Sequence, residues 1–152
     1  MAKFKTQARR DLIAEFKTFY GDLTAQDLKS LSSIYHEEVT FIDPVMQVNG
    51  RESLQAYLEH GLSNAQSCQF VIHEEMIDAK QGFLVWQMRL QHEKLAGGIE
   101  IVVPGTTHVV FDEETNSIRH HIDYYDLGAM IYEHIPVLGW VINKVRRRLE
   151  HA

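Results

Sequence analysis

The amino-acid sequence predicts an α+β fold, in which three N-terminal helices pack on a strongly bent, mostly antiparallel sheet. Two observations support this prediction. Up to about residue 62, apolar side chains recur three or four positions apart, which is the spacing of one helix face. From Cys68 to Tyr125 they alternate with polar ones, and turn residues separate long runs. Helices followed by a series of strands are typical of the α+β class, in which the helices cover the sheet.

The composition fits a single domain. The chain has 152 residues, of which 45% are hydrophobic and 24% charged, and this length is enough to bury a core. The net charge of −6 gives no support to a nucleic-acid partner. The single Cys68 excludes an internal disulfide and suits a reducing compartment. The sequence has no apolar run of the ~18 residues needed for a membrane span, and its start lacks the apolar segment of a signal peptide. We therefore expect a soluble, cytoplasmic protein.

Three helices are predicted in the first 62 residues. The first covers residues 8–20 and ends at Gly21, because glycine is favoured just after a helix. Thr24 and Asp27 have the spacing of a capping box and predict a second, short helix. A third helix follows Gly50. The residues predicted to form the apolar faces of these helices are Ala8, Leu12, Ile13, Phe16, Phe19, Tyr20, Leu28, Leu31, Tyr35, Leu54, Tyr57, Leu58 and Leu62.

Five strands are predicted from alternation and turn residues. A short early strand, 39–43, ends against Pro44, because proline cannot donate to a ladder. The others are expected from Cys68 onward and at 84–91, 99–111 and 118–125. In the strand from Cys68, the adjacent carboxylates at 74–75 predict a bulge. The Pro-Gly pair at 104–105 predicts an interruption with a bend in the strand 99–111.

Several short motifs resemble the NTF2-like superfamily. They are Phe-Tyr-Gly-Asp-Leu at 19–23, Phe-Ile-Asp-Pro at 41–44 and the closing Ile-Arg-His-His-Ile-Asp-Tyr-Tyr-Asp at 118–126. The chain is most similar to the SnoaL-like polyketide cyclase and ketosteroid isomerase branches, over roughly residues 8–126. The resemblance implies a cone-shaped domain at 1–126. The tail at 127–152 departs from the compact family members, and its spacing predicts a C-terminal amphipathic helical extension. The superfamily contains both enzymes and proteins without activity, so the fold alone does not give the function.

Asp43 is the first candidate catalytic residue. Its Asp-Pro-Val setting is similar to that of the general base of ketosteroid isomerase, which removes a proton next to a carbonyl. Burial among aromatic side chains would favour the protonated carboxyl. The chain departs from that family at the oxyanion hole, because Phe19 stands where the family has a tyrosine and Thr107 where it has an aspartic acid. The alternative interpretation is that Asp43 only caps the turn at Pro44.

His121 and Asp123 are the other candidate catalytic residues. They share one face of the last strand with Arg119 and Tyr125, because side chains two apart point the same way. SnoaL-like cyclases resemble this chain in ending the strand with His-x-Asp, so the resemblance implies an acid or base there. The alternative is that this row faces solvent or a dimer partner. The predicted pocket lining is Phe19, Tyr20, Tyr35, Tyr57, Trp86, Met88, Thr107, His108 and Arg119.

Two classes of function follow. One is an enzyme of isomerase, cyclase or dehydratase type that acts by acid–base chemistry on a small apolar carbonyl or polyketide-like compound. The other is a non-catalytic ligand-binding or accessory domain with the same pocket. We expect no cofactor and no metal, because the nine histidines do not have the spacing of a strong metal motif.

Two contacts with partners are predicted. A homodimer is expected through the outer sheet face, because long strands with apolar rows on both faces need covering twice. Apolar residues of the tail recur at helical spacing and basic residues cluster at its end, and Pro136 and Gly139 are expected to divide it into two short helices. It is expected to fold over the cavity or pack on a dimer partner. The alternative is contact with a membrane surface or a protein through residues 140–152.

Overall fold

A computed structural model of the protein describes residues 1–150, apart from the side chain of Ala2. In chain order the elements are α1 (Ala2–Gly21), the 3₁₀ turns η1 (Leu23–Ala25) and η2 (Leu28–Ser33), β1 (Tyr35–Ile42), β2 (Gln47–Asn49), α2 (Arg51–Leu62), β3 (Ala65–Ile77), β4 (Gln81–His92), η3 (Ala96–Gly98), β5 (Ile101–Phe111), β6 (Ile118–Tyr125), α3 (Leu127–Met130), η4 (Tyr132–His134) and α4 (Pro136–Glu150). The helices α1 and α2 precede the long strands β3 to β6, and a helical segment follows them, as the sequence predicts.

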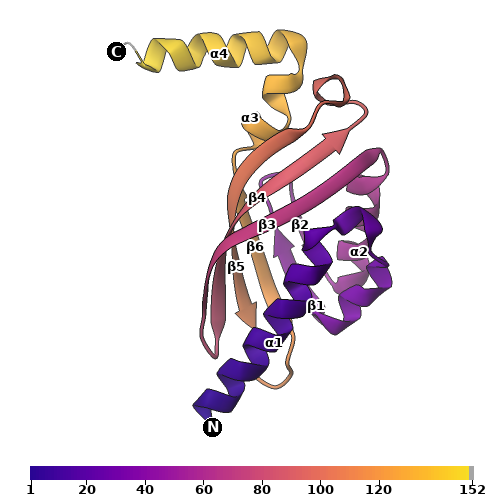
Figure 1. The fold of residues 1–152 in the computed structure, drawn as a ribbon, viewed down its shortest axis with the longest axis vertical. Coiled ribbons are helices and arrows are strands. Elements are labelled where there is room, and N and C mark those ends of the chain that lie inside the picture. The colour runs from indigo at the N-terminus through magenta and orange to yellow at the C-terminus, as the bar shows by residue number, and fades with distance from the viewer. Residues whose placement is uncertain (151–152) are drawn as a thin grey trace.

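The strands form one open sheet in the order β2-β1-β6-β5-β4-β3. The pair β1–β6 is parallel and the other neighbours are antiparallel. The sheet is strongly bent, with α1 lying across it and α2 beside β1 and β2 (Figure 1). This arrangement confirms the predicted α+β fold with a mostly antiparallel sheet. It also places β6 in the middle of the sheet, with β1 on one side and β5 on the other.

Apolar side chains of α1, α2 and the sheet form one core. From α1, the core takes Leu12, Ile13 and Phe16, all at most 3% exposed, on the predicted face of the helix. The helix starts earlier than predicted. Its first turns are mostly polar and contribute little to the core, so the apolar spacing did not indicate them. Phe4 there is 84% exposed. The packing of α1 on β3 and of α2 on β1 closes the concave side of the sheet.

Two local predictions in the strands have different outcomes. The bulge near 74–75 is confirmed, since the β3–β4 register shifts between Ile72 and Glu74. The interruption at 104–105 is wrong, because β5 runs through both residues without a break. Pro104 and Gly105 pair there with Gln87 and Trp86 of β4. A Cβ at position 105 would overlap the indole of Trp86, so this glycine makes room for the indole and does not end the strand.

The second predicted helix is a pair of 3₁₀ turns, and its cap differs from the expectation. Asp27 itself caps η2, and its carboxylate accepts a hydrogen bond from the backbone N–H of Lys29 at 3.0 Å. Thr24 donates instead to Asp22 at 3.1 Å. The two residues therefore do not form a capping box. The early strand is also longer than predicted and starts at Tyr35, because β6 pairs with both ends of it.

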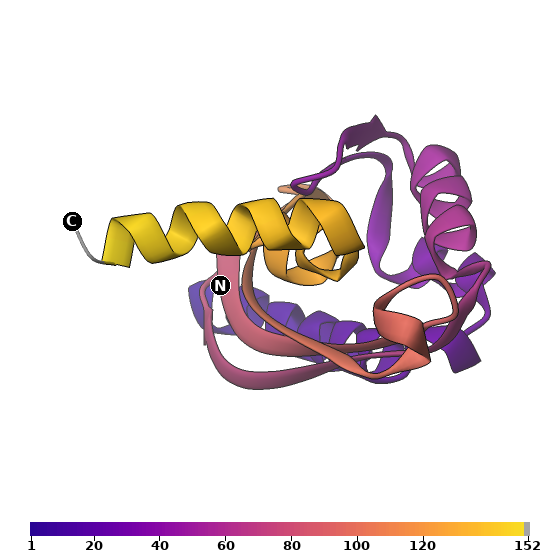
Figure 2. The same ribbon diagram turned by 90° about the horizontal axis from the view of Figure 1, so that it is seen from above.

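The C-terminal segment leaves the domain after β6. Asp126 caps α3 through the N–H groups of Gly128 and Ala129, and α4 begins at Pro136, one of the two residues at which the tail was expected to divide. Gly139 does not divide α4. It lies inside the helix where a Cβ would overlap the carbonyl of Glu133, so it allows α4 to cross η4 closely. Seen from above, α3 lies over the sheet and α4 projects away from the body (Figure 2). The expectation that the C-terminal helix folds over the cavity is therefore wrong for α4.

The last two residues of the predicted extension, 151–152, lie outside the described residues. Within residues 1–150, no helix is both long and apolar enough to cross a membrane.

Candidate functional site

The site lies on the inner face of β6, around His121 and Asp123. The imidazole of His121 is 1% exposed and the Asp123 side chain is 10% exposed. On the same strand, His120 and Tyr124 point outward and are exposed. The sequence left open which face of this strand is buried. The structure places His121 and Asp123 inside.

His121 is held at both ring nitrogens. Its Nε2 lies 2.7 Å from Oδ1 of Asp123, and its Nδ1 lies 2.8 Å from the hydroxyl of Tyr35. The Tyr35 hydroxyl in turn lies 2.6 Å from that of Tyr20. Since α1 supplies Tyr20 and β1 supplies Tyr35, α1 must be packed on the sheet before the imidazole of His121 is oriented.

Asp123 is joined to the neighbouring strands by Thr107. The two residues are directly opposite in the β5–β6 ladder, so their side chains leave the sheet on the same side. The Thr107 hydroxyl donates to Oδ1 of Asp123 at 2.5 Å and accepts from Nε1 of Trp86 at 2.7 Å. The indole reaches Thr107 because Gly105, which faces it across the ladder, has no side chain. All side-chain hydrogen bonds of Asp123 to residues 1–150 use Oδ1.

Aromatic rings surround His121. The ring centroids of Phe41, Phe16, Tyr35 and Tyr20 lie 4.5, 5.7, 5.8 and 6.1 Å from that of the imidazole. Beside it is a cavity of about 10 Å³, which is close to the smallest space that holds one water molecule. It is lined by Phe16, Tyr20, Phe70, Ile72, Trp86, Thr107, His121 and Asp123. The side chains of the pair therefore face a narrow, largely apolar space.

Asp43 lies at the end of β1, apart from the His121 pair, and both its oxygens have donors. Oδ1 accepts from the backbone N–H groups of Val45 and Met46 at 2.8 and 3.0 Å. Oδ2 accepts from the hydroxyl of Tyr57 at 2.5 Å. The bonds to Oδ1 have the geometry of the turn cap that the sequence offered as the alternative. No measurement bears on a catalytic role of this carboxylate, which stays a prediction.

The tyrosines near the two carboxylates are held in the neutral form. Burial is the main cause that raises the pKa of Tyr57 and of Tyr125. The negative charges of Asp43 and Asp123 raise both values further. Asp123 and Asp43 therefore act on the same two phenols. Tyr125 has no hydrogen-bond partner for its hydroxyl within residues 1–150, so this hydroxyl remains available to a ligand.

Of the predicted lining residues, Tyr20, Trp86 and Thr107 line the cavity and Tyr35 lies behind His121. Phe19 and Met88 are buried in the core, but they do not line this cavity. Tyr57 is bound to Asp43. Three residues that line the cavity, Phe16, Phe70 and Ile72, were not among the predicted lining residues. The spacing of Phe16 and Tyr20 on one helix face, and of Phe70 and Ile72 on one strand face, would have indicated them.

Two predicted lining residues lie elsewhere. Arg119 points to the outer side, where it forms an ion pair with Glu38 at 2.9 Å and contacts His36. His108 stacks on Phe83 with ring centroids 4.3 Å apart, also on the outer face. The placement of both in the pocket is therefore wrong. His108 is next to the inward Thr107 on β5, so alternation turns it outward. Arg119 is two positions from His121, and its different direction follows from the register shift between Val110 and Phe111, which leaves Arg119 without a partner in the β5–β6 ladder. Within residues 1–150, no group of three His, Cys, Asp or Glu side chains is arranged to hold a metal ion.

Comparison with known proteins agrees with this fold. A family model, the SnoaL-like domain, matches residues 16–121, which is more than half of the chain. The chain belongs to the SnoaL-like domain family. The match spans the elements from α1 to β6 and includes His121. No curated protein matches the chain.

Solved structures of other SnoaL-like proteins share the fold. One from Shewanella denitrificans, whose name provisionally assigns it to the polyketide cyclases, is 22% identical over 80% of this chain and 93% of its own, with a TM-score of 0.69. A protein with a ketosteroid isomerase-like fold from Catenulispora acidiphila, in complex with trimethylamine, is 14% identical over 81% and 90%, with a TM-score of 0.68. One from Agrobacterium tumefaciens, provisionally named an isomerase, is 17% identical over 79% and 98%, with a TM-score of 0.59. At these identities the likeness concerns the fold.

Proposed function

We propose that the protein is an acid–base enzyme that moves a proton next to the carbonyl group of a small, largely apolar compound, with Asp123 as the base. The observation that carries this proposal is the bonding of the Asp123 carboxylate. Oδ1 is fixed by Thr107 and His121, while Oδ2 has no protein donor within residues 1–150. A carboxylate held by one oxygen at an apolar cavity is positioned to use the other as a base.

The hydrogen bonds allow one consistent placement of protons for this role. An ionised Asp123 only accepts, so Thr107 and Nε2 of His121 both donate to Oδ1. Nδ1 of a neutral His121 then accepts from Tyr35, whose oxygen accepts from Tyr20. In this arrangement each group between Trp86 and Tyr20 has a partner. The imidazole orients the carboxylate, and Tyr35 fixes the tautomer of the imidazole.

Proton transfer to Oδ2 of Asp123 would leave negative charge on the carbonyl oxygen of the substrate. The hydroxyl of Tyr125 is the available donor for that oxygen, because it has no other partner within residues 1–150 and its raised pKa keeps it protonated. Such a donor stabilises the charge that develops during the reaction. The proton on Asp123 can then return to a different atom of the same compound, which gives an isomerisation, or take part in ring closure or loss of water.

The size of the cavity limits the substrate. At about 10 Å³ it does not hold a compound with a carbon skeleton. Binding therefore requires movement of lining side chains or of α3, where Met130 packs against the core. We expect small or flat compounds, which need the least displacement of Phe70, Ile72 and Trp86.

A second function is a non-catalytic binding domain, and the small cavity favours it. A pocket that is nearly filled by its own side chains is a poor container for chemistry, and the network around His121 would then serve to satisfy buried polar groups.

Exchange of hydrogen for deuterium at carbon separates the two functions. Small cyclic and aromatic ketones are incubated with the protein in D₂O, and loss of the signal of protons next to the carbonyl is followed by NMR. The proposal predicts accelerated exchange for at least one compound, reduced at least about 100-fold in Asp123→Asn, since a positioned base contributes about 10²–10⁴-fold. A compound that binds both proteins equally but exchanges in neither would contradict catalysis and support the binding domain.

A further inference from the structure

The helix α4 is the least integrated part of the molecule. Its main neighbour in the fold is η4, whereas each of the long strands β3 to β6 contacts at least two other elements. Within residues 1–150, a single ion pair ties α4 to the segment before it, between Arg146 and Glu133. The helix projects sideways from the top of the molecule (Figures 1 and 2). It therefore presents most of its surface away from its own domain.

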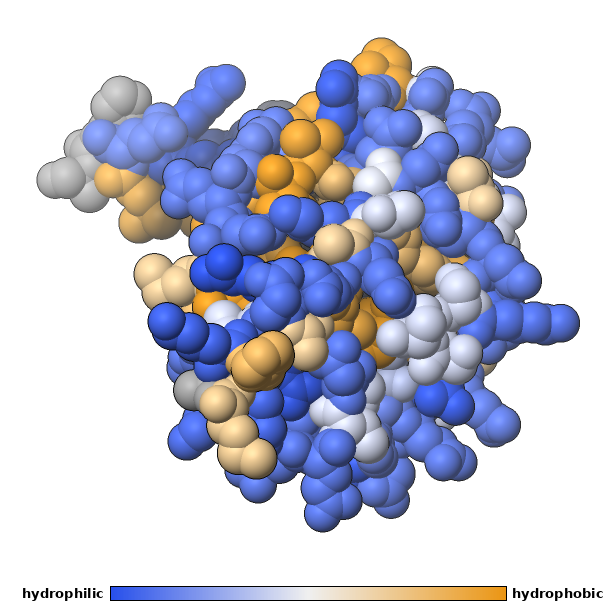
Figure 3. All heavy atoms as spheres, turned by 60° about the horizontal axis from the view of Figure 1, so that its bottom comes forward, coloured by the Kyte–Doolittle hydropathy of each residue, from blue (hydrophilic) through white to orange (hydrophobic). Residues whose placement is uncertain are grey.

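This surface carries an apolar strip. Four side chains at spacings of three and four residues form it, so they lie on one helix face. Their exposed fractions are 39% for Leu138, 42% for Val141, 53% for Val145 and 74% for Leu149. In the space-filling view, hydrophobic residues (orange) appear beside hydrophilic ones (blue) on the segment that projects at the upper left (Figure 3). An uncovered strip of this length is unusual on a folded domain and indicates a partner.

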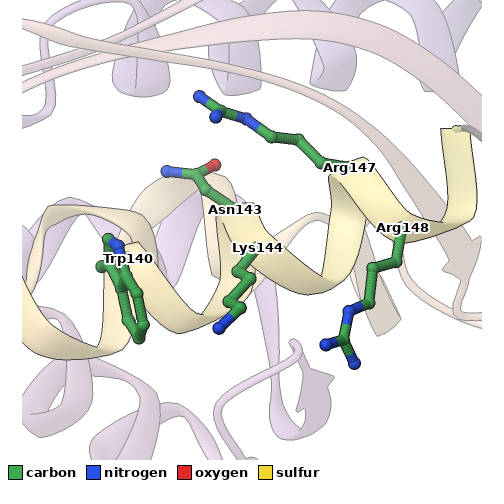
Figure 4. A pocket seen from close by; sticks show the side chains of 5 residues that line it. All are labelled: Trp140, Asn143, Lys144, Arg147 and Arg148. Carbon is green, nitrogen blue, oxygen red and sulfur yellow. The ribbon is translucent and has the colours of Figure 1, made fainter.

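Cations border the strip. The net charge of α4 is +3, from the cations Lys144, Arg146, Arg147 and Arg148 and the anion Glu150. Since the whole chain has a net charge of −6, the residues outside α4 sum to −9. Within residues 1–150, Lys144, Arg147 and Arg148 form no ion pair, and Lys144 lies over the ring of Trp140 at 4.9 Å. A surface hollow of about 740 Å³ runs along the helix and is lined by Trp140, Asn143, Lys144, Arg147 and Arg148 (Figure 4). The positive charge is thus exposed and free to meet an anionic partner.

We propose that α4 docks the protein on an anionic lipid bilayer. A helix with an apolar strip and a strongly basic polar face lies in the plane of such a surface, and the charge of α4 is opposite to that of the lipid. Pairing with the α4 of a second copy is the weaker alternative, because it would bring two charges of +3 into contact. A flat bilayer also needs no groove on the partner, which suits a helix that stands clear of its own domain.

The end of the sheet next to α3 and α4 adds further apolar contacts. The strands β1 and β6 are parallel and β5 is antiparallel to β6, so the segments after β1 and before β5 lie at the same end as α3. Val45 and Met46 follow β1 and are 49% and 47% exposed, and Ile99 precedes β5 and is 72% exposed. Docking through α4 would bring this end toward the lipid. The inference does not depend on the catalytic proposal.

Vesicle flotation of the full chain tests the inference. Vesicles of phosphatidylcholine alone are compared with vesicles that contain phosphatidylglycerol, at low and high salt. We expect binding to the anionic vesicles only, weakened by salt. Replacing Arg147 and Arg148 by Gln should reduce the partition coefficient about 25-fold, since each cation contributes about fivefold near an anionic surface. Val145→Asp should weaken binding as well, because it interrupts the apolar strip with a negative charge.

The matched control is Lys29→Gln with Lys80→Gln, which removes the same charge from exposed sites outside α4. It should retain binding. Because α4 makes few contacts with the body, the α4 variants should have the same circular dichroism as the unmodified protein. Absence of binding to the anionic vesicles, or an equal loss in the control, would overturn the inference. So would an α4 variant that changes the mass of the protein in solution without lipid, since that result would assign the strip to a second copy.

Discussion

Removal of the Thr107 hydroxyl tests how the site is held together. Thr107→Val keeps the volume of the side chain and removes one acceptor and one donor. The hydroxyl accepts from Trp86 at 2.7 Å and donates to Asp123 at 2.5 Å. Because Trp86 is 2% exposed, its indole N–H would be left without a partner or water, which costs about 1–3 kcal/mol. Asp123 keeps the bond from His121 and some access to water, so its loss is smaller, about 1 kcal/mol. We expect a total destabilisation of about 2–4 kcal/mol.

Thr107→Ser is the matched control, because it keeps the hydroxyl and removes only a methyl group. Its expected cost is about 1 kcal/mol. Both variants are compared with the unmodified protein by urea unfolding at one protein concentration, with near-ultraviolet circular dichroism to follow Trp86. If Thr107→Val unfolds at the same urea concentration as Thr107→Ser, or is as stable as the unmodified protein, the hydroxyl does not join the two strands as described.

Three further predictions concern Arg9 of α1, the thiol of Cys68 and the outer face of the sheet. The Arg9 guanidinium donates to the carbonyls of Ala79, Asp112 and Thr115 at 3.3, 2.5 and 2.8 Å. Arg9→Met should therefore destabilise the fold by about 2–4 kcal/mol in urea unfolding, with little recovery in Arg9→Lys; equal stability of the two variants and the unmodified protein would contradict this. Burial raises the pKa of the Cys68 thiol to about 12 from 9.0, so at pH 8 a disulfide reagent should react roughly a thousandfold more slowly than in 6 M guanidinium. Because the pKa of Cys68 is higher in the folded chain than in the unfolded one, the stability that the protonated thiol allows is complete below about pH 9 and is lost as the pH rises towards about 12. Fast labelling of Cys68 at pH 8 would contradict the burial of the thiol. We also propose a homodimer through the outer sheet face, where Phe83, Val85, Val102 and Tyr124 are 40–59% exposed; light scattering should give twice the 17.6 kDa of one chain, lowered by Val85→Glu, and a monomer at micromolar concentration would contradict the proposal.

The sequence predicts the helices and strands well, because their periods depend on burial on one face. It could not decide which face of β6 is buried. Ile118 and His121 are both buried although they are three positions apart, which a strict alternation forbids. The β5–β6 register shifts between Val110 and Phe111, and the chain passes from Ile118 to His120 across that shift. A bulge of this kind changes the face of a strand without a signal in the pattern of apolar residues.

The position of α4 was also beyond the sequence. Its apolar spacing is the same whether the strip covers a cavity or faces outward, so periodicity predicts the helix and not its partner. Gly139 illustrates the limit, because a glycine in a helical pattern is typical of a break. Here it makes room for the carbonyl of Glu133, a contact that only the folded chain reveals.

The assignment of the proton transfer to Asp123 is tested most directly by comparing the two carboxylates in the deuterium exchange assay. Rates are measured for Asp123→Asn and Asp43→Asn with the same ketone, beside the stability of each protein. The account predicts that Asp123→Asn slows exchange at least about 100-fold. It predicts that Asp43→Asn keeps the rate within a few-fold but lowers stability by about 1–3 kcal/mol, because the Tyr57 hydroxyl loses its acceptor. A large loss of rate in Asp43→Asn with an unchanged rate in Asp123→Asn would contradict the account and move the base to the end of β1.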